Sequence, residues 1–141
     1  MSSKYPSVLD ANAVGTYLAR AFAGGGYVWD AVLEYRVWCH PERGAPDLFD
    51  GDDYFEAFVS YSDALRFSKS TPGAESPLAL ILQREYISEP EPGMFEHIKE
   101  ERMTEWPVEF LSRPKRTPRT IPDFFAPDAP ENRIAILRGD A

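Results

Sequence analysis

Residues 54–87 constrain the fold more than any other part of the chain. They begin with YFEAFV, which predicts a short strand. Ser60 or Ser62 then caps a helix over Asp63–Lys69, because a serine side chain accepts a hydrogen bond from the first helical amides. Leu78–Leu82 is continuously apolar, which is typical of a strand covered on both faces. This order of strand, helix and strand indicates an ordered α+β fold.

The longest strand is expected over Tyr27–His40. Its odd-numbered residues are nearly all apolar, whereas the even-numbered ones include Asp30, Glu34 and Arg36. Successive strand residues face opposite sides, so one face should lie in the core and the other should be mixed and partly exposed to solvent. A strand of this length is unusual, and we expect a bulge or break near Asp30.

Further elements are expected on both sides of these strands. Asp10 caps a predicted helix over Ala11–Ala23, which the glycines at 24–26 end. Residues 41–53 predict an acidic surface loop. After a turn at Pro90 and Pro92-Gly93, Met94–Lys99 predicts a strand, and residues 102–111 predict a pairing segment or short helix. The sum is a single α+β domain with a mostly antiparallel sheet and flanking helices.

The composition changes at residue 113. Six of the 13 prolines fall within residues 107–130, which favours an extended arm. Three apolar residues are expected to anchor it in surface grooves: Ile121, Phe124 and Phe125. A last helix is expected near Pro130–Arg138, with Asp128 as its cap. The sequence therefore predicts a core domain over residues 1–112 and a proline-rich arm over residues 113–141, packed on the core and ending in a short helix.

Size and charge limit the class of protein. A chain of 141 residues with 43% hydrophobic residues suffices for one domain with one core. The formal net charge of −8 repels phosphate backbones, so no nucleic acid is expected as a partner. The basic stretch Ser112–Thr120 is expected to be a solvated linker, the alternative being a site for an acidic partner.

Cysteine usage and hydropathy indicate the compartment. A single cysteine, Cys39, excludes an internal disulfide and fits a reducing cytoplasm. No apolar run approaches the roughly 20 residues of a membrane span, and the first residues lack the pattern of a signal peptide. We expect a cytoplasmic protein without membrane contact.

The sequence predicts no metal site and no activated nucleophile. The histidines are His40 and His97, and no CxxC or HExxH pattern occurs. Cys39 lies in the apolar set of its strand, which favours an inert buried thiol over a nucleophile paired with His97. GxSxG is absent, and the glycines at 24–26 follow a predicted helix, whereas phosphate loops precede one.

Two polar clusters supply candidate catalytic residues. The first lies on the even-numbered side of the long strand: Glu34, Arg36 and His40. Arg36 can bind an anion through its planar fork and His40 can titrate near neutrality, the alternative being an ion-pair ladder that serves solubility. The second cluster is Lys99–Arg102 followed by Thr104–Trp106. There Trp106 can desolvate Glu105 and raise its pKa as a general acid requires, the alternative being a charged turn beside a packed Trp. The candidate catalytic residues are Arg36, His40 and Glu105.

Four segments resemble a group of small proteobacterial proteins labelled GNAT-type N-acetyltransferases: EYRVWCHP, YFEAFVSYSDALRFS, ESPLALILQREYI and KEERMTEWPVEFL. The resemblance covers roughly Tyr5–Gly139 and implies an acyltransferase-like protein. That family binds the acetyl-CoA pyrophosphate with an Arg/Gln-x-x-Gly-x-Gly/Ala loop. Here Gln83-Arg84 is followed by Glu85-Tyr86-Ile87 without glycine. No cofactor-binding residue is therefore carried over, and an acyl carrier would bind in an atypical way or not at all.

The order of other residues is similar to that in ADP-ribosyltransferase-type folds. These often have a strand with Arg or His, then an aromatic strand leading into a helix, then a late glutamate. Arg36 or His40, Tyr54–Ser60 and Glu105 follow that order here. The resemblance implies that Arg36 holds a phosphate of a nicotinamide dinucleotide, that Ser60 supports the strand, and that Glu105 orients the attacking hydroxyl.

Three functions remain open at this point. The first is an atypical acyltransferase-like protein, and the second is a transferase that uses NAD. The third is a non-enzymatic interaction module, which acidic charge, many aromatics and a proline-rich arm would all suit. The expected partner is a small molecule, another protein or a second copy of the chain as a homodimer, while the cofactor is left open.

Overall fold

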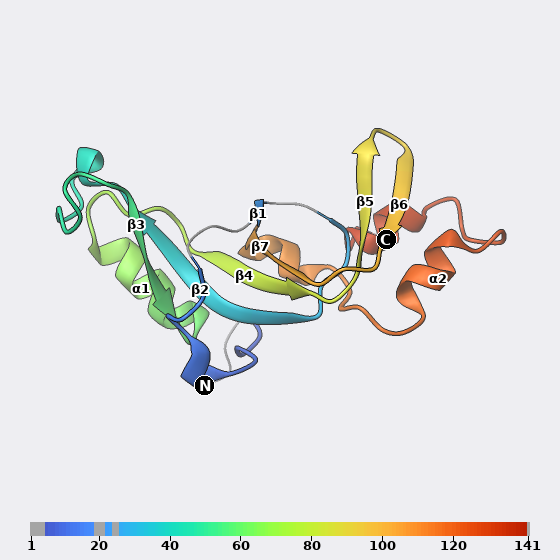
Figure 1. Ribbon diagram of the computed structural model, residues 1–141, viewed down its shortest axis with the longest axis horizontal. Coiled ribbons are helices and arrows are strands. Elements are labelled where there is room, and N and C mark those ends of the chain that lie inside the picture. The colour runs from blue at the N-terminus through green and yellow to red at the C-terminus, as the bar shows by residue number, and fades with distance from the viewer. Residues whose placement is uncertain (1–4, 19–21, 24–25, 141) are drawn as a thin grey trace. The chain divides into compact units, whose positions relative to one another are not determined.

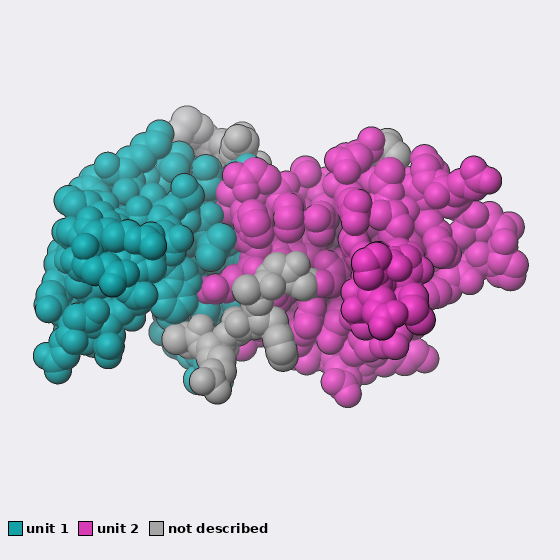
Figure 2. Space-filling view, turned by 90° about the horizontal axis from the view of Figure 1, so that it is seen from above, with its two compact units in different colours: residues 1–21, 32–80 teal, residues 22–31, 81–141 magenta. Residues whose placement is uncertain are grey.

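The structure, a computed structural model, describes residues 5–18, 22–23 and 26–140. The chain forms two compact units, shown in different colours in Figure 2. Unit 1 comprises residues 1–21 and 32–80, and unit 2 comprises residues 22–31 and 81–141. Residues 113–141, the expected arm, thus belong to unit 2 together with residues 81–112. Two of the crossings between units fall inside strands, namely β2 (Ala31–Cys39) and β4 (Leu78–Gln83).

The fold is α+β with a mostly antiparallel sheet, as the sequence predicts. Within the described residues, one sheet has the order β1-β7-β4-β2-β3 and a second consists of β5 and β6 (Figure 1). β2 pairs antiparallel with β3 (Tyr54–Phe58), whereas β1 (Phe22–Ala23) runs parallel to β7 (Arg102–Pro107). β5 (Tyr86–Glu91) and β6 (Met94–Ile98) form an antiparallel hairpin that turns at Pro92-Gly93 as predicted, while Pro90 lies within β5.

Unit 1 contains the predicted helix α1 (Tyr61–Ser70). The Oγ atom of Ser60 accepts a hydrogen bond from the Asp63 amide at 3.2 Å, so Ser60 rather than Ser62 is the cap. The helix packs through Phe67 against a small core of buried residues on β2, β3 and the loop between them: Cys39, Ala45 and Tyr54. That loop contains one 3₁₀ turn, η2 (Pro41–Arg43).

The helix predicted over Ala11–Ala23 is wrong. The described part of this span contains a single 3₁₀ turn, η1 (Ala11–Ala13), and strand β1. The helix cannot continue because Gly15 adopts a φ of +88° and donates its amide hydrogen to Oε1 of Glu34 at 2.9 Å. The Gly15 amide thus donates to a strand that is distant in the sequence, and the helix that the spacing of apolar residues predicted does not form. Residues 19–21 and 24–25, which also belonged to this prediction, lie outside the described residues.

The strand predicted over Tyr27–His40 is shorter, and its break lies near Asp30 as expected. β2 starts at Ala31, whereas Tyr27 and Trp29 form isolated bridges. The apolar face is confirmed, since Tyr35 and Val37 are completely buried. The expectation of a partly solvated second face is wrong, because Glu34 and Arg36 on that face are also fully buried.

Unit 2 has a core to which the C-terminal segment contributes much. Its buried apolar cluster is Val28, Ile87, Ile121, Phe124 and Leu137. The last three come from helices α2 (Thr120–Phe125), which the sequence did not predict, and α3 (Arg133–Leu137). Ile121 and Phe124 are buried as expected, but Phe125 is 40% exposed. Asp128 does not cap α3, because the N-cap position belongs to Asn132.

After β7 the chain forms another 3₁₀ turn, η3 (Val108–Ser112), whose Val108 and Leu111 are buried. In the part of the chain that the structure describes, no helix combines the length and the apolar character needed to cross a membrane.

Candidate anion-binding site

Arg36, the first predicted site residue, is neutralised inside unit 1. Its Nε atom donates to Oε2 of Glu34 at 2.6 Å, and its Nη2 atom donates to the carbonyl oxygen of Leu18 at 2.6 Å. The guanidinium also lies 4.1 Å from the ring centre of Phe55. Both charges of the Arg36–Glu34 pair are fully buried. This arrangement leaves Arg36 as a structural cation, and a role for it as an anion ligand stays a prediction.

His40, the second predicted residue, lies between two acidic side chains. Its Nε2 atom is 2.8 Å from Oε2 of Glu75. Its Nδ1 atom is 2.9 Å from Oδ1 of Asp53, close enough for an ion pair but without the alignment of a hydrogen bond. The hydrogen bond with Glu75, followed by the contact with Asp53, raises the pKa of His40. The carboxylates therefore favour the imidazolium form.

His40 also belongs to a group of three side chains whose types can bind a metal ion. One ligand atom each of His40, Glu42 and Asp53 lie within 4.8 Å of one another. The sequence predicted no such site, because the grouping depends on the β2–β3 pairing. This arrangement also fits a protonated His40 paired with carboxylates. A metal ligand must be a neutral imidazole, and the raised pKa of His40 opposes that form.

Glu105, the third predicted residue, lies on β7 of unit 2, beside the fully buried Trp106. Arg36 lies on β2 and His40 directly follows that strand, both in unit 1, so the structure places only these two relative to each other. Glu105 is opposite Ala23 in the parallel β1–β7 pair. Its role as a general acid stays a prediction.

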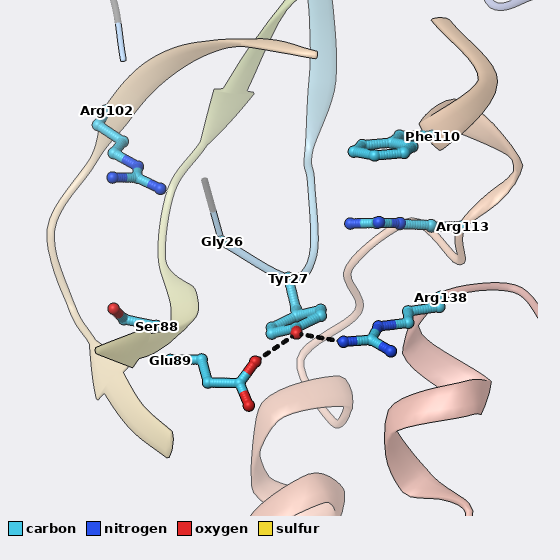
Figure 3. Close-up of a pocket in the computed structure, with 8 residues that line it drawn as sticks. All are labelled: Gly26, Tyr27, Ser88, Glu89, Arg102, Phe110, Arg113 and Arg138. Carbon is cyan, nitrogen blue, oxygen red and sulfur yellow. Dashed lines mark hydrogen bonds between the residues drawn. The ribbon is translucent and has the colours of Figure 1, made fainter. Parts of the chain in front are cut away.

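Unit 2 contains a cavity of about 530 Å³ that the sequence did not indicate (Figure 3). It is lined by residues from five stretches of the chain: Gly26, Tyr27, Ser88, Glu89, Arg102, Phe110, Arg113 and Arg138. Three of the eight are arginines and one is acidic. In a chain with a net charge of −8, such a concentration of positive charge is a local exception.

The backbone beside the cavity is strained. Gly26 has a φ of +80°, and a side chain at this position would place its Cβ atom 2.7 Å from Nε2 of Gln83. Val28 has a φ of +90°, which is unusual for a β-branched residue and costs about 1–3 kcal/mol. The strain is maintained because Val28 is buried in the core and its carbonyl oxygen accepts a hydrogen bond from Nε2 of Gln83 at 2.9 Å. These contacts fix Tyr27 in the cavity wall.

The Tyr27 hydroxyl joins one acid and one base of the cavity. It donates to Oε1 of Glu89 at 2.6 Å and accepts from Nη2 of Arg138 at 2.9 Å, as the dashed lines of Figure 3 show. Oε2 of Glu89 accepts the Gly93 amide at 2.8 Å. The bonds from Tyr27 and then Gly93 lower the pKa of Glu89. Glu89, the one carboxylate among the described lining residues, is thus favoured in its ionised form and is already bonded through both oxygens.

The two remaining arginines are supported by aromatic rings. The guanidinium of Arg113 lies 3.8 Å from the ring centre of Phe110, and Figure 3 shows the two groups stacked. The guanidinium of Arg102 lies 3.9 Å from the ring centre of Tyr86, and its Nε atom donates to Oε1 of Gln83 at 2.7 Å. Burial lowers the pKa of both arginines. A bound anion would offset this cost of desolvating the two charges.

Arg113 is the arginine with the least compensation. Among the described residues, no carboxylate lies within 4 Å of its guanidinium. Arg138 adds to the lowering of its pKa, while Tyr27 and Asp140 oppose it. The sequence contains only one signal for this residue, its membership of the basic stretch 112–120. That stretch was expected to be solvated, but Arg113 in fact lines a cavity.

Comparison of the chain with protein-family models, with curated proteins and with solved structures finds no match. The site is therefore interpreted from its geometry.

Proposed function

We propose that unit 2 binds a small molecule that carries a phosphate or pyrophosphate group in the cavity of Figure 3. The observation that carries this proposal is the set of three arginines around one cavity, in which the one carboxylate among the described lining residues is already bonded. Guanidinium groups match phosphate oxygens in charge and geometry, because each presents several N–H donors in one plane.

The cavity is also prepared for such a ligand. Arg102 and Arg113 are held against aromatic rings, so little side-chain freedom remains to be lost on binding. A volume of about 530 Å³ lies in the range of small-molecule sites. Tyr27 and Phe110 add ring surface for an apolar or planar part of the ligand.

The proposal suits both transferase hypotheses. Acetyl-CoA and NAD each contain a pyrophosphate, and the cavity offers an atypical place for it in a chain without the glycine loop. Such ligands occur in the cytoplasm, the location that we propose for the chain. An acyltransferase-like function is our first specific candidate and an NAD-using transferase is the second. An interaction module would use the same cations for an acidic group of a protein partner.

The test measures ligand binding by calorimetry and thermal unfolding. Pyrophosphate, acetyl-CoA and NAD are compared with sodium chloride at equal ionic strength. A ligand at a hundred times its dissociation constant stabilises the native state by about 2.7 kcal/mol, a shift of several degrees. Arg113→Met should weaken binding about 10- to 100-fold, the value of a charged hydrogen bond. Arg113→Lys, which keeps the charge, should lie in between.

The matched control is Arg119→Met, at an arginine of the same unit whose side chain is 84% exposed and outside the cavity. It should bind like the unchanged chain. The proposal is refuted if none of the three ligands binds beyond the salt effect, or if both arginine-to-methionine variants lose the same affinity.

A further inference from the structure

A second cavity, of about 410 Å³, lies in unit 1 and is independent of the anion site in unit 2. It is lined only by aromatic residues and aspartates: Trp38, Phe49, Asp52, Asp53, Tyr54 and Phe55. None of the three predicted catalytic residues lines it, and the proposed phosphate ligand lies in the other cavity. A combination of ring faces with carboxylates is a chemistry that recognises organic cations.

The rings are held in place by the sheet. Trp38 on β2 is directly opposite Phe55 on β3, with ring centres 5.1 Å apart and planes at 53°. Phe49 packs on Tyr54 with ring centres 5.4 Å apart, yet it remains 57% exposed. An exposed phenylalanine at the edge of a cavity is apolar surface that a ligand can cover.

Phe55 already interacts with a cation in this structure. The guanidinium of Arg36 lies 4.1 Å from its ring centre. Glu34 compensates the charge of Arg36, so this contact adds no net positive charge beside the rings. The segment around the rings is negatively charged, since residues 42–56 contain one base, Arg43, and six acids: Glu42, Asp47, Asp50, Asp52, Asp53 and Glu56.

The two aspartates of the cavity differ in their partners. Asp53 lies 2.9 Å from Nδ1 of His40, so its charge is partly compensated. Among the described residues, no basic side chain lies within 4 Å of the Asp52 carboxylate. Two hydrogen bonds order the loop that carries Asp52. The Asp52 amide donates to the carbonyl oxygen of Phe49 at 3.0 Å, and the Gly51 amide donates to Oδ1 of Asp47 at 2.7 Å. Asp52 is therefore a positioned charge beside the ring surface.

We propose that this cavity binds the alkylated ammonium group of a small molecule. Methyl groups on the nitrogen would cover Trp38, Phe49 and Phe55, while the positive charge would face Asp52. A neutral ligand would bury ring surface but gain no attraction from the carboxylate, and an anion would be repelled. A metal ion would gain little from the rings, because hard cations prefer oxygen ligands.

The test is a titration of the full chain with tetramethylammonium and choline, monitored by NMR through the indole N–H signals. The chain has three tryptophans, of which Trp38 lies in unit 1 and the other two in unit 2. Only the Trp38 signal should shift. The neutral isostere of choline, 3,3-dimethylbutan-1-ol, should bind up to about tenfold more weakly than choline, because it lacks the charge. Sodium chloride at the same ionic strength controls for screening.

Two variants locate the site. Phe49→Leu and Asp52→Asn change exposed side chains and should each weaken choline binding severalfold, with the fold intact. Phe125→Leu, the same change at a partly exposed phenylalanine of unit 2, is the matched control and should have no effect. The proposal is overturned if the neutral alcohol binds as tightly as choline, if Asp52→Asn binds choline unchanged, or if no titrant shifts the Trp38 signal. None of these outcomes would contradict the proposed phosphate site of unit 2, which is tested with other ligands and variants.

Discussion

Alanine substitutions at two glycines of unit 2 can measure the energetic cost of an added Cβ atom beside the anion site. Gly26 and Gly93 have nearly the same backbone angle, with φ of +80° and +82°. An alanine in this left-handed region costs about 1–2 kcal/mol at either position. The surroundings differ, because a Cβ atom at Gly93 would meet nothing within 4 Å, whereas one at Gly26 would lie 2.7 Å from Nε2 of Gln83.

The side chain of Gln83 cannot move away cheaply. It is completely buried, and its two polar atoms are bonded to the carbonyl of Val28 and to Nε of Arg102. A shift that breaks the bond to Val28 leaves a buried polar group without a partner, which costs about 1–3 kcal/mol. We therefore expect Gly26→Ala to lower the free energy of unfolding of unit 2 by about 2–5 kcal/mol, and Gly93→Ala by about 1–2 kcal/mol.

The assay is urea unfolding monitored by NMR through the indole signals of Trp29 and Trp106, which both belong to unit 2. Gly26→Ala should also weaken pyrophosphate binding, because Nη2 of Arg102 would lie 3.1 Å from the new Cβ atom. The reasoning fails if the two alanine variants lose equal stability, since the contact with Gln83 would then contribute nothing.

Further predictions concern unit 1. Ser60→Ala should destabilise it by about 1 kcal/mol in urea unfolding because α1 loses its cap, whereas Ser62→Ala should change little. Arg36→Met should lower the free energy of unfolding by about 3–5 kcal/mol because it leaves the Glu34 charge buried. Adding Glu34→Leu to this variant should restore part of the loss. The pairing would be contradicted if the double variant were as unstable as Arg36→Met alone or less stable still. The carboxylates beside His40 raise its pKa in the folded state, so their stabilising contribution is present at pH 5.5 and is lost as pH rises through that pKa. His40→Gln should remove this decline between pH 5.5 and 8.5, and an unchanged profile would exclude His40 as its source.

Local sequence patterns predicted the elements that depend on neighbours in the chain. The cap and helix at Ser60, the apolar strand β4 and the turn between β5 and β6 each follow from short-range chemistry. The α+β class followed from their order. The helix over Ala11–Ala23 failed because Gly15 makes its decisive hydrogen bond with Glu34, a partner that no local window contains.

The candidate site depended even more on long-range contacts. Arg36 looked like an exposed ligand because its strand position alternates with apolar residues, but Glu34 and the N-terminal segment cover it. Arg102, Arg113 and Arg138 are separated in the sequence and gave no common pattern. They meet only because the Tyr27 segment and the chain after β7 belong to one compact unit.

The discontinuous make-up of the two units sets an order of events during synthesis. Val28 leaves the ribosome long before Ile121, Phe124 and Leu137, with which it shares a core. All residues of unit 1 have been synthesised by residue 80, whereas residues 22–31 wait for residues 81–141 to complete unit 2. A stalled chain that ends before Leu137 would present an incomplete apolar cluster to chaperones, and no uninterrupted fragment of the gene would encode either unit alone.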